Sequence, residues 1–143
     1  MSVSTRFALV VVLSSLMSAT WVMPAHAGPV QVILVGANEV PGPGDPDGDG
    51  TFVAKINAGR ATLCYTLTVS GIEPATAAHV HVGTIAEAGP VVIALVPPTT
   101  GSSTACASAD RELLRAITRN PDNYYVNVHN AAYPAGALRG QLS

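Results

Sequence analysis

The chain has 143 residues, of which 48% are hydrophobic and 11% are charged, and its formal net charge is −2. Its length predicts one domain, and its low charge content excludes a disordered polyelectrolyte. Because seven basic residues face nine acidic ones, the chain has no excess of positive charge to neutralise a phosphate backbone. We therefore do not expect it to bind nucleic acid.

Residues 1–27 have the pattern of a secretory signal peptide. A polar start that contains Arg6 precedes the apolar run Phe7–Leu13, and the segment ends in Ala25–Ala27, a small-x-small pattern that signal peptidase recognises. The apolar run is too short to cross a bilayer as a permanent helix, so a retained N-terminal anchor is the less favoured alternative. We expect cleavage after Ala27, a mature domain of residues 28–143, and a secreted or periplasmic location without a stable membrane span.

Several short stretches of the mature chain alternate apolar and polar side chains, which is typical of half-buried β-strands. The clearest covers residues 60–70. A continuous apolar run at residues 90–96 predicts a strand that is covered on both faces. Residues 108–118 have helical spacing instead, and a cap at Ser108 or Asp110 predicts one short surface helix. The expected strands cover residues 30–36, 51–57, 60–70, 77–83, 90–96, 124–129 and 137–142.

These elements predict an all-β fold. About seven short strands with one surface helix are typical of an antiparallel two-sheet sandwich or a squat barrel. The apolar positions of the strands are mostly Val, Leu, Ile and Ala, so we expect a core with few large aromatic side chains.

The chain contains two cysteines, Cys64 and Cys106. An exported protein reaches an oxidising compartment, so we expect one disulfide between them, worth about 3–4 kcal/mol in the chain-entropy model. Cys64 lies on the polar face of its expected strand, where the segment before the helix could bring Cys106 to meet it. A metal-binding or catalytic thiol is the less favoured alternative, because neither cysteine has a CxxC partner.

The three histidines of the mature chain occur at two places. His79 and His81 lie two residues apart on an expected strand, so their side chains project from the same face about 7 Å apart. His129 ends another expected strand. Three imidazoles with an open fourth position suit zinc or copper, and the absence of Met and free Cys from the mature chain argues against a soft Cu(I) carrier. The alternative is a surface patch of histidines that hydrogen-bond neighbouring loops.

The strand period also predicts the direction in which these histidines point. It places the neighbouring valines in the core and directs the imidazoles outward. Replacing His81 by Ala is therefore expected to cost little stability, because no core side chain is lost. Arg139 has the same outward direction on the last expected strand.

An acidic loop provides a weak candidate for calcium binding. Asp45, Asp47 and Asp49 occupy positions 1, 3 and 5 of an EF-hand-like pattern with Gly50 at position 6, but Ile56 stands where the pattern needs Glu. An acidic turn rich in Asp and Gly is the favoured interpretation.

No complete set of catalytic residues is visible in the sequence. The chain has no GxSxG elbow and no GxGxxG or phosphate-binding loop, and its carboxylates are scattered in expected loops and turns. We therefore lean towards a protein that is not an enzyme.

Six motifs occur in a fixed order along the chain, with a Gly-rich acidic loop after the first. They are Asn38-Glu39-Val40-Pro41, Leu63-Cys64-Tyr65, Ala78-His79-Val80-His81-x-Gly83, Gly89-Pro90-Val91-Val92, Tyr125-Val126-Asn127-Val128-His129 and Pro134-x-Gly136-x-x-Arg139-Gly140-Gln141-Leu142. Together they resemble the CHRD domain, a module that is repeated in chordin and found singly in many secreted bacterial proteins. The resemblance covers residues 28–143 and implies an extracytoplasmic, immunoglobulin-like β-sandwich. Because chordin binds growth factors, it also implies a binding module whose partner is an unknown protein or extracellular ligand.

A second resemblance concerns the histidines. The His-Val-His strand, the later Val-His and the Arg-Gly pair are similar in order to the copper side of copper/zinc superoxide dismutases. This resemblance implies that His79, His81 and His129 hold copper rather than zinc, and that Arg139 guides an anion. The bridging histidine and the zinc ligands of those enzymes have no counterpart here. We expect an exported binding module with a copper site, and the alternative is a copper-dependent redox protein resembling a copper-only superoxide dismutase.

Overall fold

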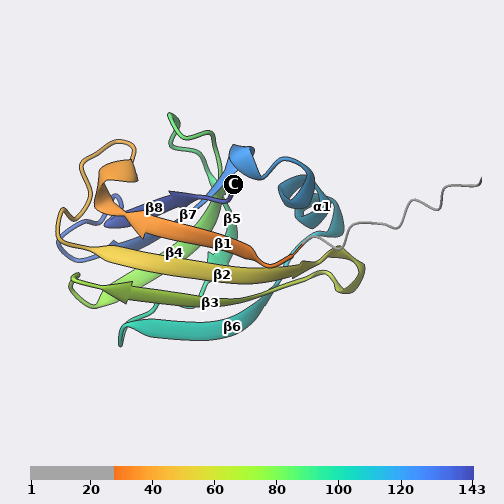
Figure 1. Ribbon diagram of the computed structural model, residues 1–143, viewed down its shortest axis with the longest axis horizontal. Coiled ribbons are helices and arrows are strands. Elements are labelled where there is room, and N and C mark those ends of the chain that lie inside the picture. Colours follow the sequence, from red (N-terminus) through yellow and green to blue (C-terminus); the bar gives the residue numbers. More distant parts are fainter. Residues whose placement is uncertain (1–27) are drawn as a thin grey trace, which may run out of the picture.

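The computed structural model describes residues 28–143 (Figure 1). The expected signal peptide lies outside the described residues. The strands are β1 (Val30–Val35), β2 (Asp49–Asn57), β3 (Thr62–Ser70), β4 (Ala75–Val82), β5 (Val91–Leu95), β6 (Ser102–Ser108), β7 (Tyr124–Asn130) and β8 (Leu138–Gln141). The helices are α1 (Arg111–Arg119) and three single-turn 3-10 helices at Gly36–Asn38, Ala58–Arg60 and Pro121–Asn123.

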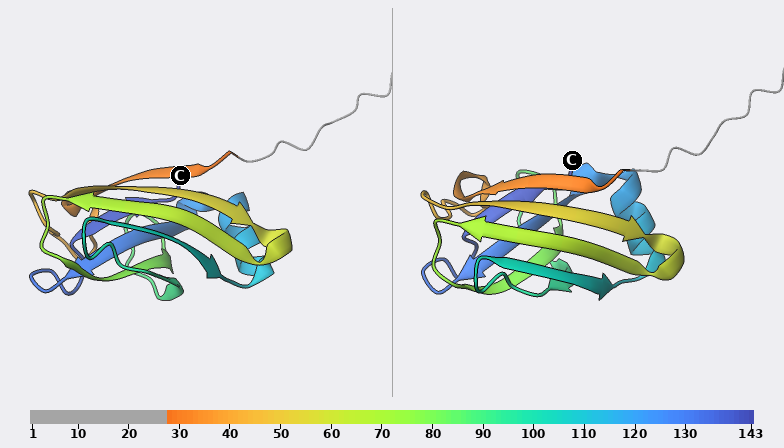
Figure 2. Two further views of the ribbon diagram at one scale, coloured as in Figure 1. Left: turned by 90° about the horizontal axis from the view of Figure 1, so that it is seen from below. Right: turned by 60° about the horizontal axis from the view of Figure 1, so that its bottom comes forward.

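The eight strands form one antiparallel sheet in the order β5-β4-β7-β8-β1-β2-β3-β6. The sheet folds over on itself, so that β1, β2, β3 and β6 form one layer and β4, β5, β7 and β8 form the other (Figure 2). The two layers are joined where β1 pairs with β8 at Val35 and Arg139. This arrangement confirms the expected antiparallel all-β sandwich, with eight strands instead of seven.

Alternate side chains of both layers fill the space between them. On β3, Leu63, Tyr65 and Leu67 are buried, and on β7 the side chains of Val126 and Val128 are buried opposite them. Because successive residues of a strand point to opposite faces, the residues between these apolar positions point away from the core. The expected alternation is confirmed for both strands.

Helix α1 lies at one end of the sandwich (Figure 1). It begins after Asp110, whose carboxylate accepts hydrogen bonds from the backbone N–H groups of Glu112 and Leu113, so the cap is Asp110. Its side chains Leu114 and Ile117 are buried in the core. Within residues 28–143, no helix combines the length and the apolar character needed to cross a membrane.

Strand β6 was not expected. Its sequence from Ser102 to Ser108 contains only small residues and alternates exposed and half-buried positions, so it lacks the large apolar side chains that mark a strand in the sequence. It pairs with β3 and forms one edge of the sheet. Because the chain is extended up to Ser108, α1 begins at Arg111 and not at residue 108.

The prediction for residues 90–96 was wrong in one respect. A strand is present as β5, but it forms the other edge of the sheet and pairs with β4 alone. Val91 and Ala94 are exposed while Ile93 and Leu95 are buried, so the strand is covered on one face and not on both. An apolar run does not by itself distinguish a central strand from an edge strand.

The disulfide between Cys64 and Cys106 is confirmed, with a sequence separation of 42. The two residues lie directly opposite each other on β3 and β6. Cys106 therefore belongs to a strand of the sheet, and the disulfide ties the edge strand β6 to its neighbour.

Candidate metal centre

The three histidines lie on neighbouring strands of one layer. His79 and His81 project from β4 and His129 projects from β7, and the register pairs Ala77 with His129 and His79 with Asn127. Each histidine offers one ring nitrogen, and these three atoms all lie within 4.8 Å of one another. Among the described residues, this is the one group of three or more His, Cys, Asp or Glu side chains that converges in this way. The structure therefore brings together the three residues that the sequence predicted.

His81 is more buried than the strand period indicated. Its side chain is 8% exposed, because the loop between β4 and β5 covers this part of the outer face. Its Nδ1 lies 2.8 Å from the carbonyl oxygen of Gly89, which can only accept a hydrogen bond, so the ring proton of neutral His81 belongs on Nδ1. Its Nε2 is buried and has no hydrogen-bond partner within the protein. His81 therefore points away from the core, as the strand period predicts, but the loop covers it and it is not exposed to solvent.

His79 and His129 form the more exposed side of the cluster. Nδ1 of His79 lies 3.3 Å from Nε2 of His129. Nδ1 of His129 lies 3.1 Å from the carbonyl oxygen of Pro134, and its Nε2 lies 3.1 Å from Oδ1 of the Asn127 side chain. Both oxygens accept hydrogen bonds, and neutral imidazole carries one ring proton, so neutral His129 donates to one of these two oxygens at a time.

The surroundings of these two histidines favour the neutral imidazole. Burial lowers the pKa of His79, and the neighbouring His129 and His81 lower it further. Burial also lowers the pKa of His129, although the hydrogen bond to the Pro134 carbonyl opposes this shift. Neutral imidazole is the form that binds metal ions. His79 and His129 therefore favour the uncharged form at neutral pH.

Arg139 lies behind the cluster on the same layer. Its side chain is 1% exposed, and its Cζ lies 3.5 Å from the centroid of the Tyr125 ring. The Tyr125 ring stacks in turn on His81, with centroids 4.8 Å apart and planes 8° apart. We call the outer side of β4 and β7, which carries His79, His81 and His129, the histidine face. The structure places Arg139 next to this face, as the sequence predicted, but beneath the surface.

Glu39 is a member of this region that the sequence did not identify as a site residue. It is 5% exposed. Burial raises the pKa of Glu39 to about 7, against the opposing effects of the Arg139 charge, the Val40 N–H and the Asn127 side chain. Gly136, with φ 151° in a region that favours glycine, lies against the Glu39 carboxyl, and a Cβ atom there would lie 2.4 Å from it. The signal available in the sequence was the presence of Glu39 in the first of the six motifs.

The acidic loop does not form a comparable cluster in the part of the chain that the structure describes. The Asp45 carboxylate accepts a hydrogen bond from the backbone N–H of Asp47, which is typical of an Asx turn. The Asp49 carboxylate accepts one from the Ser70 hydroxyl on β3. These contacts favour the acidic-turn interpretation over a calcium site.

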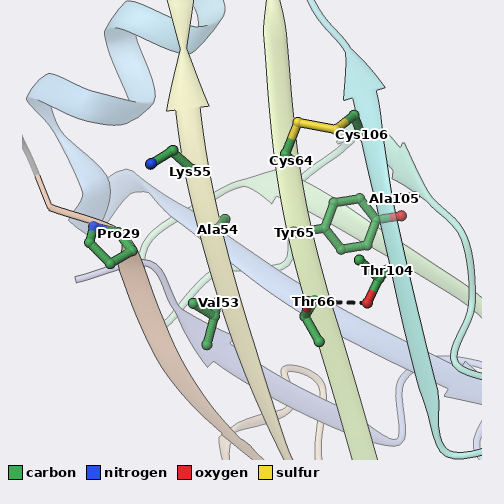
Figure 3. Close-up of a pocket in the computed structure, with 10 residues that line it drawn as sticks. All are labelled: Pro29, Val53, Ala54, Lys55, Cys64, Tyr65, Thr66, Thr104, Ala105 and Cys106. Carbon is green, nitrogen blue, oxygen red and sulfur yellow. Dashed lines mark hydrogen bonds between the residues drawn. A yellow bond between two sulfur atoms is a disulfide. The ribbon is translucent and has the colours of Figure 1, made fainter.

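A shallow hollow of about 440 Å³ lies on the other layer, over β2, β3 and β6 (Figure 3). The Cys64–Cys106 disulfide and the hydrogen bond between the Thr66 and Thr104 hydroxyls lie across it. Lys55 is the one charged side chain among its lining residues. None of the residues that line the hollow is a histidine or a carboxylate. Among the described residues, the groups that could bind a metal ion therefore lie at the three histidines and not here.

The sequence of the described domain matches a known family. A family model of the CHRD domain covers residues 30–142. The chain belongs to the CHRD domain family. The match extends from the first residue of β1 to the residue after β8, so the CHRD domain includes the whole sandwich and all three histidines. No match was found among curated proteins or among solved structures.

Proposed function

We propose that this chain is an exported, non-catalytic binding module. In this proposal a transition-metal ion is bound by His79, His81 and His129, and copper(II) is the favoured ion. The observation that carries the proposal is the buried Nε2 atom of His81. The Gly89 carbonyl directs the proton of this ring to Nδ1, which leaves Nε2 as an acceptor with no partner within the protein. A buried polar atom without a hydrogen bond costs about 1–3 kcal/mol, and a metal ion at this position would use its lone pair.

The spacing of the nitrogen atoms fits a metal ion. Zinc binds imidazole nitrogen at about 2.0–2.1 Å, so two ligands of a tetrahedral zinc site lie about 3.3 Å apart. The His79 and His129 nitrogens are 3.3 Å apart. One ring nitrogen of His81 lies within 4.8 Å of a ring nitrogen of each of the other two histidines, so a movement of about 1.5 Å or less would bring the three imidazoles to the spacing of metal ligands.

Copper(II) is preferred to zinc for two reasons. Nitrogen ligands bind divalent copper more tightly than divalent zinc. In addition, residues 28–143 contain no methionine, and both cysteines form the disulfide, so the soft ligands that favour Cu(I) are absent from the described domain. Zinc is the second choice because three histidines with an open position also suit it.

Export is part of the proposal. Membership of the CHRD family and the disulfide support an extracellular location, and the signal-peptide pattern of residues 1–27 remains a prediction. The physiological partner would be an unidentified protein or extracellular ligand, not a nucleic acid.

The structure gives less support to the redox alternative. That alternative required Arg139 to guide superoxide or peroxide to the copper ion. Arg139 is 1% exposed, and one of its guanidinium nitrogens donates hydrogen bonds to the carbonyl groups of Thr84 and Glu87. A side chain in this position is poorly placed to attract an anion from solvent.

Titration of metal-free residues 28–143 with Cu(II) against a competing chelator tests the proposal, with electron paramagnetic resonance to count the nitrogen ligands. We expect one bound ion with three nitrogen ligands, and an affinity at least about tenfold lower in His81→Ala. Glu73→Gln, which removes an exposed carboxylate elsewhere, should bind as the wild type does. Equal affinity in His81→Ala and wild type would overturn the proposal, and superoxide removal that depends on His81 would favour the redox alternative.

A further inference from the structure

We propose that Arg139 is a positioning residue for His81. Arg139 acts through Tyr125 and through the loop at residues 83–90. Tyr125 fixes the plane of the His81 imidazole, and the loop fixes the tautomer in which Nε2 carries no proton and is free for a metal ion. This inference rests on the proposed function, because a free Nε2 matters only if a ligand uses it. It assigns Arg139 a role different from anion guidance.

The first step is the attachment of the loop to β8. One guanidinium nitrogen of Arg139 donates hydrogen bonds to the carbonyl oxygens of Thr84 and Glu87, at 2.7 and 3.0 Å. The side-chain amide of Gln141, two residues further on β8, donates to the carbonyl oxygen of Gly83 at 2.8 Å. Three carbonyl groups of the loop are thus held by two side chains of one strand. Arg139 supplies two of these three contacts.

The second step is the contact between the loop and His81. The carbonyl oxygen of Gly89, near the end of the loop, lies 2.8 Å from Nδ1 of His81. The backbone N–H of Gly89 donates to the Tyr125 hydroxyl at 3.1 Å. A Cβ atom at Gly89 would lie 1.6 Å from the Val82 carbonyl oxygen, so the loop passes this point at a distance that only glycine allows. The position of the Gly89 carbonyl, and with it the tautomer of His81, therefore depends on how the loop is held.

The third step is the stack of three planar groups. Strand β7 lies between β4 and β8, so Tyr125 has His81 on the β4 side and Arg139 on the β8 side. The Arg139 Cζ is 3.5 Å from the ring centroid, and the Tyr125 and His81 rings are 8° from parallel. A guanidinium over an aromatic face is attractive, and this contact keeps the Tyr125 ring against His81. The plane of the imidazole is set by this stack.

Arginine suits this position and lysine does not. A planar guanidinium can lie on a ring and donate hydrogen bonds in its own plane at the same time, whereas an ammonium group is a point charge. Burying a charge for the sake of stability alone is unfavourable, because an apolar side chain of similar volume is often as stable or more so. The nearby Glu39 carboxyl partly offsets the charge of Arg139. A buried arginine that binds the loop carbonyls and lies on the Tyr125 ring is better explained by positioning than by stability.

The first arm of the test uses metal-free protein, so that it does not depend on the proposed function. Long-range ¹H–¹⁵N correlation spectra of the histidine rings report which nitrogen carries the proton. We expect His81 to be protonated on Nδ1 alone in the wild type and to show both tautomers in Arg139→Lys. Arg115→Lys makes the same change at an exposed arginine of α1 and should keep the wild-type tautomer. An unchanged tautomer in Arg139→Lys would overturn the inference.

The second arm measures Cu(II) affinity in the same variants. Loss of a group that orients a metal ligand typically lowers affinity 10–100-fold, and we expect a loss of this size in Arg139→Lys and none in Arg115→Lys. A variant with lower melting temperature but wild-type affinity would assign Arg139 a structural role only and overturn the inference. If the wild type binds no copper, the proposed function fails while the tautomer arm still decides the positioning role. Should Arg139→Lys fail to fold, Tyr125→Leu removes the same stack and is expected to give the same mixture of tautomers, with a single tautomer refuting the inference.

Discussion

Replacing Glu39 by Gln should stabilise the protein at alkaline pH and have little effect at acid pH. Burial raises the pKa of Glu39 to about 7 from an ordinary value of 4.5. Because the folded state binds this proton more tightly than the unfolded chain, the contribution of Glu39 to stability is fully present below pH 4.5 and is lost as the pH rises through about 7. Above pH 7 the folded protein contains a buried carboxylate that Arg139 only partly compensates. Glutamine has the shape of the protonated acid and avoids this cost.

The size of the effect follows from the same values. A pKa raised from 4.5 to about 7 corresponds to about 3 kcal/mol. Local rearrangement and water reaching the carboxylate would reduce this cost, so we expect an observed difference of about 2 kcal/mol. Such a difference is large compared with the effect of an ordinary surface substitution, which is about 0.5 kcal/mol or less.

Urea unfolding of residues 28–143 at pH 5 and pH 8 measures this difference directly. Glu39→Gln should gain about 2 kcal/mol over the wild type between the two pH values, while Glu73→Gln, at an exposed position, should change by less than about 0.5 kcal/mol. The same stability difference at both pH values would show that Glu39 does not titrate between them. A loss of stability in Glu39→Gln at pH 8 would show that the carboxylate forms a net stabilising pair with Arg139, and would refute the reasoning.

Three further predictions concern the histidines and the disulfide. Burial lowers the pKa of His79 and His129, so Cu(II) affinity measured by chelator competition should stay constant down to about pH 6.5 and decrease below it, as protons compete for the imidazoles; a decrease that begins near pH 8 would contradict this. His81→Ala should destabilise the metal-free protein by about 1–2 kcal/mol in urea, because the ring is buried against Tyr125; an unchanged midpoint would show that the stack contributes nothing. Replacing both cysteines by Ser should cost about 4 kcal/mol in the chain-entropy model, given a sequence separation of 42, and alkylation of the native exported protein without reductant should modify no thiol.

The sequence predicted the strands that have one face in the core. In β3 and β7, large apolar side chains alternate with polar ones, and this period reflects burial between two layers. The same period placed His79 and His81 on one face, and the antiparallel pairing of β4 with β7 brings His129 beside them. The shared face of His79 and His81 was therefore predictable from the local sequence, whereas the approach of His129 depends on the pairing of β4 with β7, which only the sheet order supplies.

The edge strands were harder to predict for opposite reasons. Strand β6 has no large apolar residue, since an edge strand held by a disulfide and by backbone pairing with β3 needs little apolar burial. Strand β5 is apolar throughout, although Val91 and Ala94 are exposed. For both strands, the position at the edge of the sheet depends on which strands lie beside them. The order of strands is a property of the whole sheet and not of the local sequence.

The strand period could not predict which side chains on the outer face of a layer are buried. The period states that His81, Arg139 and Gln141 point away from the core, but it does not state whether a loop covers them. In the described residues, four of the five buried side-chain polar atoms without a partner within the protein belong to Glu39, His81, Arg139 and Gln141, all on or over this face. Folded proteins satisfy nearly all their buried polar groups, so exceptions gathered in one place are not explained by folding stability. This distribution independently favours the histidine face as the functional part of the domain, because a bound ligand would use polar atoms that the fold itself does not.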